Sequence, residues 1–292
     1  MNDDLTLSRQ KPAGMQSYAF QLHFWKIMRT IVVGLAAVVT VFPFLWMLMM
    51  SLKIHRDALT IPPQFIFLPT FKNYIVVLSK LEFLRGILNS FVISASTIFV
   101  SVFFGMLAAY AISRFKFVGS RTILYGMLFT RVFPPISMVI PYYLIIRSLG
   151  LYDTYVSLVL AYLSINIPLV TWLIKGYIDS LPQEIEHCAM IDGCSRFQTI
   201  VKISLPLIAP GIVATGIFSL FVSWNNFLFP LILSSKRAKT LPVYIAEYVG
   251  TTGIAWPQIM AASVIALIPV IVFTYIVQHK LVQGLSAGAV KG

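Results

Sequence analysis

Long apolar runs constrain this sequence more than any other feature. Several uncharged stretches reach the roughly 20 residues that a helix needs to cross about 30 Å of hydrocarbon. Of the 292 residues, 58% are hydrophobic and only 11% are charged, whereas an ordinary soluble domain has about 25% charged residues. The sequence therefore predicts an all-α protein that crosses a membrane several times.

Glycine, proline and charged residues divide the apolar sequence into six predicted transmembrane helices. The predicted spans are 27–50, 86–113, 122–146, 155–174, 205–233 and 259–278. The first span is too long for the apolar core of a signal peptide, so we expect it to be retained. The proline-rich segment between the first two spans is predicted to lie on the membrane surface and to contain a short helix.

An even number of spans places both termini on the same side of the membrane. Twelve Lys and Arg residues lie toward the side of the termini, and nine lie toward the opposite side. Because cytoplasmic loops are enriched in positive charge, this bias favours cytoplasmic termini. We therefore expect an N-terminal tail of residues 1–26, a transmembrane domain of residues 27–283 and a C-terminal tail of residues 284–292.

Charge and cysteine usage exclude several other functions. The formal net charge is +12, but no basic stripe interleaved with aromatic residues predicts nucleic-acid binding, and membrane lipid headgroups are the better partner. Cys188 and Cys194 form neither a disulfide framework nor a metal pair, so we expect no metal site and expect both cysteines to be small fillers of apolar space. The four histidines are dispersed, which disfavours a membrane enzyme. An ion-coupled secondary transporter remains an alternative, although the predicted spans lack the carboxylates that it would use.

Residues 179–206 are unusually polar for this chain. Ser180, placed before a Leu-Pro pair, predicts the start of a helix, and Asp192-Gly193 predicts its end. Ser195 and Gln198 match a second capping box. We expect two short amphipathic helices joined at the glycine, with an apolar face that docks into a groove of a partner. A solvated surface loop is the alternative.

Prolines recur within the predicted spans, where each one removes a backbone hydrogen bond and bends its helix. Kinked packing in a helix bundle explains any single proline. The cluster Phe133-Pro134-Pro135, followed by Pro141, predicts more specifically a bent third span that lines a cavity.

The polar loop resembles the EAA loop of ABC importer permeases, whose pattern is Glu-Ala-Ala, then Asp-Gly, then Ile-x-Leu-Pro. This chain has Cys188-Ala189, Asp192-Gly193 and Ile203-Ser204-Leu205-Pro206 at these places, but His187 replaces the glutamate and Glu186 precedes it. The resemblance implies that the ATPase-coupling residues are Glu186, His187, Cys188, Ala189, Asp192, Gly193, Arg196 and Pro206. Further motifs at 113–119, 149–154, 224–227 and 284–292 resemble the maltose-type permeases of the carbohydrate branch.

The resemblance implies a type I ABC importer permease architecture in a bacterial or archaeal inner membrane. It also implies a heterodimer with a sister permease, two ATPase subunits that grip the EAA loops and an extracytoplasmic solute-binding protein that delivers a sugar, an oligosaccharide or a related polyol. No Gly-Lys dipeptide occurs, so a Walker A phosphate loop is absent. We expect no enzymatic activity and no directly bound cofactor, with ATP and Mg held by the ATPase subunits. The tail from Gly284 is implied to reach the ATPase interface, and a mobile terminus is the alternative.

The candidates for substrate contact are fewer. Arg131 is the only charged residue placed deep in a predicted span, and an ionisable group there is a functional candidate. It could bind an acidic or hydroxylated substrate, pair with the sister subunit or extend toward the membrane surface. Trp224, Asn225 and Asn226, expected in mid-span, offer an aromatic face and amides suited to sugar hydroxyls, and amides that bridge helices are the alternative. The weaker candidates are Asn89, Tyr142 and Asn166.

Overall fold

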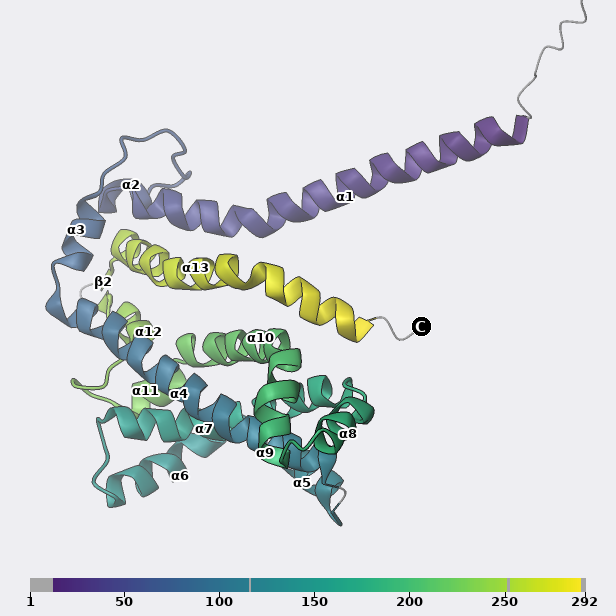
Figure 1. The fold of residues 1–292 in the computed structure, drawn as a ribbon. Helices are drawn as coiled ribbons and strands as arrows, with labels where there is room; N and C mark the ends of the chain where they lie inside the picture. The colour runs from purple at the N-terminus through teal and green to yellow at the C-terminus, as the bar shows by residue number, and fades with distance from the viewer. Residues whose placement is uncertain (1–12, 116, 251–252, 290–292) are drawn as a thin grey trace, which may run out of the picture.

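The computed structural model describes the backbone of residues 13–115, 117–250 and 253–289, and the side chains of residues 24–115, 117–249 and 254–275. Helices build nearly all of this part of the chain (Figure 1). Within it, the β-structure consists of two short paired strands, β1 (Val249–Gly250) and β2 (Gly253–Ile254). The predicted all-α class is confirmed.

Among the residues that the structure describes, five helices are long and apolar enough to cross a membrane, and a sharply bent pair raises the number to six. The five are α1 (Ala13–Ser51), α4 (Leu81–Arg114), α7 (Tyr155–Asp179), α10 (Leu205–Trp224) and α13 (Trp256–Ala289). The six predicted spans are therefore present, with the third formed by the bent pair.

The third span is broken rather than curved. Helix α5 (Ser120–Phe129) continues into a 3-10 turn, η1 (Thr130–Val132), and then meets α6 (Pro135–Ser148) at an angle of 98°. Phe133 and Pro134 between them are extended, with ψ angles of 128° and 130°. A residue before proline avoids the helical region, so two consecutive prolines force two extended residues and a break. The predicted bend is confirmed.

The fifth span is shorter than predicted. Helix α10 ends at Trp224, and residues Leu228–Leu233 form a separate short helix, α11. The side chain of Asn226 accepts a hydrogen bond from the backbone N–H of Phe229 at 3.3 Å. Asn226 therefore provides a hydrogen-bond acceptor at the start of α11 instead of continuing α10. The prediction of one span over 205–233 is wrong at this end, because local capping overrides apolar length.

Short helices cover the ends of the long ones. Helices α2 (His55–Ala58) and α3 (Lys72–Leu78) connect α1 to α4, as predicted for that segment, and α12 (Leu241–Ala246) precedes the strands. The ammonium group of Lys53, which is only 1% exposed, donates a hydrogen bond to the backbone carbonyl of Gln64 at 2.5 Å. This contact folds the segment after α1 back onto itself.

Helix α7 packs against both α4 and α10 because glycines allow the backbones to approach closely. A Cβ atom on Gly105 of α4 would lie 2.7 Å from Val170, and one on Gly211 of α10 would lie 2.4 Å from the ring of Tyr177. Small residues at such crossings are the usual device by which membrane helices pack. Larger side chains at either glycine would separate the helices.

A polar network joins the same three helices inside the bundle. Asn166 of α7 donates hydrogen bonds to the carbonyl of Tyr162 at 2.9 Å and to the hydroxyl of Ser223 at 3.3 Å, and it accepts one from Ser219 at 2.8 Å. Ser219 in turn lies 3.3 Å from Ser101 of α4. Asn166, one of the weaker substrate candidates, is fully buried, and its amide bridges helices, which is the role stated above as the alternative for Asn225 and Asn226.

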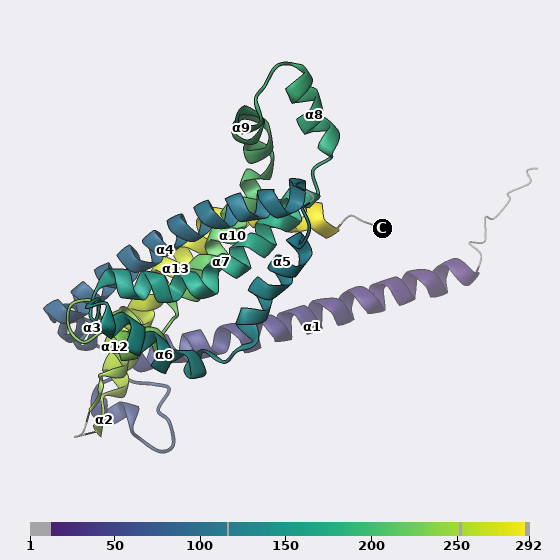
Figure 2. The same cartoon turned by 90° about the horizontal axis from the view of Figure 1, so that it is seen from below.

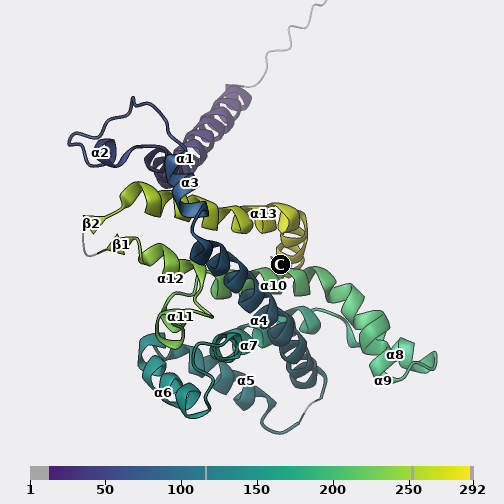
Figure 3. The ribbon, with the colours of Figure 1, turned by 90° about the vertical axis from the view of Figure 1, so that its left-hand side faces the viewer.

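Helix α1 projects away from the other helices and runs beside α13 only near its C-terminal end (Figures 1 and 3). The most apolar stretch of its Phe24–Ser51 segment has no residue buried within the chain. A second projection, formed by α8 (Gln183–Ile191) and α9 (Arg196–Thr199), leaves one end of the bundle (Figure 2). The first turns of α1 and the last turns of α13 lie toward that same end (Figure 1).

Candidate functional site

The α8–α9 projection contains the polar loop identified in the sequence. Gly193 has a φ angle of +90° and ends α8 after Asp192. The N–H of Gly193 donates to the carbonyl of Met190 at 3.1 Å, and the N–H of Cys194 donates to that of Ala189 at 3.0 Å. These bonds satisfy the carbonyls at the helix end, as expected for a left-handed cap. The predicted helix–glycine–helix arrangement is confirmed.

The two helix starts in the loop differ in how well they were predicted. Ser195 and Gln198 form the complete capping box at the start of α9, as predicted. The residue before α8 is Pro182 and no side chain caps this helix; the hydroxyl of Ser180 instead donates to the carbonyl of Tyr177 at 2.7 Å. The capping role predicted for Ser180 is wrong, because its side chain closes the end of α7.

Glu186 anchors α8 to the bundle. Its side chain is buried, and the Nε atom of Arg114, at the end of α4, lies 3.0 Å from its Oε1 atom. The hydroxyl of Ser204 also donates to Oε1 at 3.0 Å, and the hydroxyl of Tyr110 donates to Oε2 at 3.1 Å. The carboxylate is therefore held by groups from α4 and from the π-helical segment η2 (Ile200–Ser204) that leads into α10.

Arg114 extends this anchor to α7. Its terminal NH2 nitrogen donates to the carbonyls of Ile178 and Leu181 at 3.0 and 3.1 Å. Loss of one partner of a buried ion pair is strongly destabilising, because the charge that remains buried and unpaired costs about 3–5 kcal/mol of folding stability. The sequence pointed to the motif at 113–119 and to Glu186 separately but did not pair them. Arg114 and Tyr110 were missed as contacts of the loop, because they are distant from it in sequence. Ser204, which lies within the loop, was missed as a partner of Glu186 because serine is chemically ordinary.

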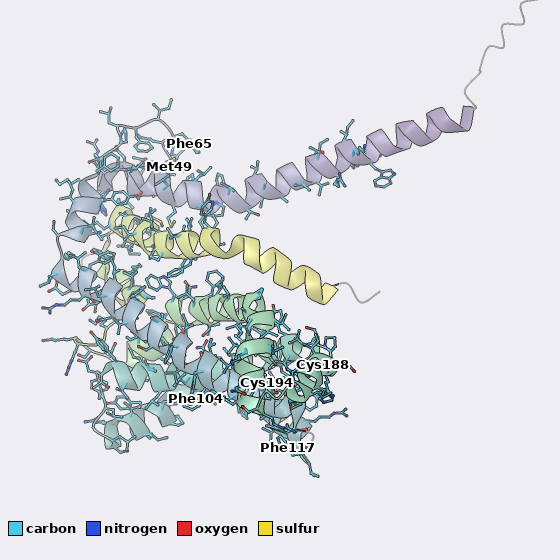
Figure 4. The ribbon with its side chains drawn as sticks, viewed as in Figure 1. Met49, Phe65, Phe104, Phe117, Cys188 and Cys194 are labelled. Carbon is cyan, nitrogen blue, oxygen red and sulfur yellow. The ribbon has the colours of Figure 1, made fainter. Side chains whose placement is uncertain are left out.

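The outer surface of the projection exposes several apolar side chains among polar and charged ones. Ile191 and Phe197 are 84% and 73% exposed, and Ile185 and Val201 are also exposed. Cys188 is an exposed free thiol and Cys194 is half-buried. Figure 4 labels both cysteines on the projection. His187, Asp192, Arg196 and Pro206 are exposed as well, whereas Ala189 faces inward with Glu186. Cys188 was expected to fill apolar space, and its exposure contradicts that expectation.

The guanidinium of Arg196 lies over the ring of Phe115, with its carbon 5.3 Å from the ring centroid. This contact links the start of α9 to the turn that follows α4. A cation over an aromatic face is worth about 0.5–1 kcal/mol at an exposed site. Two helices of the bundle and both helices of the projection thus meet around residues 110–115.

Two of the substrate candidates line one cavity. Arg131, in the 3-10 turn, and Tyr142, in α6, border a cavity of about 230 Å³ together with Ser164 of α7 and Phe229 of α11. The rings of Tyr142 and Phe229 meet edge to face, with centroids 5.4 Å apart. Ser164 lies nine residues beyond the start of α7, or about 14 Å at the helical rise of 1.5 Å per residue. The cavity is therefore well inside the span and adjacent to the break in the third span.

The remaining candidates make contacts within the chain. The indole N–H of Trp224 donates to the carbonyl of Ala266 at 3.2 Å, and this side chain is only 4% exposed. The amide of Asn225 donates to the backbone carbonyl of Phe221 at 3.0 Å. Trp224 and Asn225 lie at the end of α10 rather than in mid-span. Asn89 donates to the carbonyls of Arg237 and Lys239 at 2.9 and 2.8 Å. These groups hold the fold together, and none of them lines the cavity that contains Arg131.

A scan against protein families matches residues 101–287 to the binding-protein-dependent transport system inner membrane component. The match covers more than half of the chain, from the middle of α4 through the loop to α13. The chain belongs to this family of membrane transport components. It is therefore a multi-pass inner-membrane permease subunit.

Curated relatives align over most of this chain. The inner membrane ABC transporter permease protein YcjP of Escherichia coli K12 is 36% identical over 265 residues, which cover 89% of this chain and 94% of the relative. The trehalose/maltose transport system permease protein MalG of Thermococcus litoralis is 37% identical over 262 residues, which cover 88% of this chain and 94% of the relative.

Solved structures share the fold. A chain from the crystal structure of a bacterial ABC transporter involved in the import of the acidic polysaccharide alginate superposes with a TM-score of 0.73 at 22% identity, and the match covers 88% of this chain and 96% of that one. A chain of the methionine transporter MetNI superposes with a TM-score of 0.58 at 14% identity, over 72% of this chain and 97% of that one. The architecture is that of an ABC importer permease, as expected from the resemblance.

Proposed function

We propose that this chain forms one half of the translocation pathway of an ATP-driven importer for a sugar, an oligosaccharide or a related polyol. Curated relatives at 30–37% identity include permeases named for trehalose, maltose and diacetylchitobiose, which supports this class of substrate. Residues 179–206 serve as the coupling loop. The chain itself performs no hydrolysis.

The anchoring of Glu186 is the observation that carries this proposal. The loop projects from the bundle, yet its first helix is fixed to α4 and α7 through a buried ion pair and several hydrogen bonds. A force on the exposed apolar surface of the loop is therefore transmitted to the bundle rather than absorbed by a flexible connection. Coupling by rigid-body movement requires such an attachment.

The partners follow from this arrangement. A sister permease completes the pathway as a heterodimer, two ATPase subunits bind ATP and Mg and contact the coupling loops, and an extracytoplasmic solute-binding protein delivers the substrate. The projection and both termini lie on the cytoplasmic side, which agrees with the excess of Lys and Arg there. The exposed side chains of Ile185, Ile191 and Phe197 fit a docking contact with an ATPase groove.

The cavity beside Arg131 is the proposed substrate contact of this subunit. A charged group in the middle of a span is costly unless it faces water, a partner or a ligand. Hydroxyl groups from Tyr142 and Ser164 and the aromatic ring of Phe229 share the cavity, and this combination of polar groups and an aromatic surface suits a sugar ring.

Reconstitution tests the proposed function directly. The chain, its sister permease and the ATPase subunits in proteoliposomes, supplied with the solute-binding protein, are expected to accumulate labelled trehalose or maltose only when ATP is present. Uptake that follows an imposed proton or sodium gradient without ATP would contradict the proposal. It would favour a secondary transporter instead.

A further inference from the structure

A cavity lined by basic residues lies at the end of the bundle opposite to the coupling loop. It has a volume of about 490 Å³ and forms between the start of α4 and the segment from 236 to 248, which lie far from α8 in Figure 1. Its charged residues are Lys80, Glu82, Arg85, Lys236, Lys239 and Glu247. Basic residues thus outnumber acidic ones by two.

Three of these cations, Lys80, Arg85 and Lys236, have no ion-pair partner among the described residues. Lys239 pairs with Glu247, and the ammonium group of Lys80 lies 4.4 Å from the centre of the Tyr248 ring. Arg85 and Lys236 are both exposed and border the same cavity. A carboxylate that entered it would meet a guanidinium and an ammonium group that the chain itself leaves available.

The loop that carries Lys236 is held in one conformation. The carboxylate of Asp153 accepts hydrogen bonds from the backbone N–H groups of residues 235–238, at 2.9–3.1 Å. Asn89 binds the carbonyls of Arg237 and Lys239, and the hydroxyl of Ser90 accepts from the N–H of Leu241 at 2.8 Å. The basic side chains therefore project from a fixed backbone, which lowers the entropy lost when a partner binds them.

Positive charge on this side of the membrane runs against the usual preference. Cytoplasmic loops are normally the ones enriched in Lys and Arg, yet nine of the 22 such residues of this chain lie toward the opposite face. Only four acidic residues accompany them there, namely Asp57, Glu82, Asp153 and Glu247. A preorganised basic cluster that opposes the topological bias calls for an acidic partner.

We propose that Lys80, Arg85 and Lys236 form a docking surface for an acidic patch on the extracytoplasmic solute-binding protein. The inference rests on the proposed function, which supplies that partner. Opposite charges steer association and fix orientation, and the cavity is large enough to admit an Asp or Glu side chain. Glu82 and Glu247 give the surface a pattern of mixed sign, which selects a partner with charges at defined positions rather than a uniformly negative lipid surface.

A charge-reversal experiment tests this surface. The double variant Arg85→Glu/Lys236→Glu is assembled with its sister and ATPase subunits in nanodiscs of neutral lipid and, separately, of anionic lipid. Its affinity for the purified solute-binding protein of the same transport system is measured at low and at high salt. Arg56→Glu/Lys72→Glu is the matched control, because these two residues are also exposed, lie toward the same face and change the net charge equally. We expect the test variant to bind at least tenfold more weakly at low salt, the control to change less than threefold, and the difference to shrink at high salt.

Each other outcome has a distinct meaning. If both variants bind the solute-binding protein equally weakly, the effect is due to net charge alone, and the proposed docking surface is wrong. Unchanged binding would overturn it as well, and loss of the heterodimer in the test variant would assign the cluster to the sister subunit. Weakening that appears only in nanodiscs with anionic lipid would assign it to lipid headgroups. If the wild-type complex binds no solute-binding protein, the proposed function itself fails, which separates the two inferences.

Discussion

The Nε atom of Arg114 lies 3.0 Å from the Oε1 atom of Glu186, and both side chains are 7% exposed. This single contact joins the last residue of α4 to the middle of α8. Because Arg114 also binds two carbonyls at the end of α7, the coupling helix is held by two helices of the bundle. The loop is thus a rigid extension of the bundle, although it projects from it.

Removal of the carboxylate should loosen this attachment. Glu186→Ala leaves Arg114 buried and unpaired, so we expect a loss of about 3–5 kcal/mol of stability, measured as a lower thermal unfolding midpoint of the detergent-solubilised protein. The rate of transport should fall more than the rate of ATP hydrolysis, because the ATPase subunits remain active but the coupling helix is only loosely attached to the transmembrane bundle. Glu184→Ala is the control, since Glu184 is exposed and should change neither quantity. Equal effects of the two substitutions would argue against the anchor.

The turn at Gly193 should tolerate few substitutions. A residue with a side chain costs about 1–2 kcal/mol in the left-handed region, and proline, with φ fixed near −65°, is incompatible with +90°. We expect Gly193→Pro to insert and fold but to abolish ATP-linked uptake, and Gly193→Asn to retain part of it. Gly126→Ala, in α5 with open space around it, serves as the control. Normal uptake by Gly193→Pro would show that the loop geometry is not needed for coupling.

Arg131 should affect transport without affecting assembly. We expect Arg131→Gln to lower the rate of uptake about tenfold, equivalent to about 1.4 kcal/mol, because one charged contact with the substrate is lost. The amount of heterodimer recovered on purification should stay unchanged. Arg147→Gln, at the end of α6 and outside the cavity, is the matched control. Normal uptake combined with a loss of heterodimer would reassign Arg131 to subunit packing.

The hydrogen bonds between Asp153 and the amides of residues 235–238 should weaken only at acidic pH. Burial alone would raise the pKa of Asp153, but the backbone hydrogen bonds from residues 235–238 outweigh it and lower that pKa from its ordinary value of 3.8. The stabilisation is therefore complete above about pH 4 and is lost as the pH falls through the lowered, folded-state pKa. We expect hydrogen-exchange protection of these amides, corrected for intrinsic rates, to be constant from pH 7 to 5 and to decrease below pH 4. Asp153→Asn should reduce the protection at pH 7, and Asp57→Asn should not.

Local signals in the sequence were sufficient for much of the fold. Apolar length identified every span, and the Phe133-Pro134-Pro135 cluster identified the break in the third, because both depend on residues close together in the chain. The glycine turn and the Ser195 capping box were predicted for the same reason. The end of α10 was missed, since hydrogen bonding by Asn226 competes with an apolar pattern that continues through Leu233.

The candidate site was less accessible to sequence reasoning. Glu186 and Arg114 are 72 residues apart, and no local pattern predicts that the fold brings them together. Asn89 and Trp224 are chemically suited to binding sugars. The amide of Asn89 instead holds the loop at residues 237–239, and the indole of Trp224 joins α10 to α13. Only the three-dimensional packing distinguishes a polar group that bridges helices from one that lines a cavity.

The side on which the coupling loop lies, and what covers it, is tested most directly by labelling of Cys188. This exposed thiol becomes the only cysteine of the chain in a Cys194→Ser variant. We expect a membrane-impermeant maleimide to modify Cys188 in inside-out vesicles and not in right-side-out vesicles, and bound ATPase subunits to protect it at least fivefold. Modification from the outside, or equal modification with and without the ATPase subunits, would contradict the account.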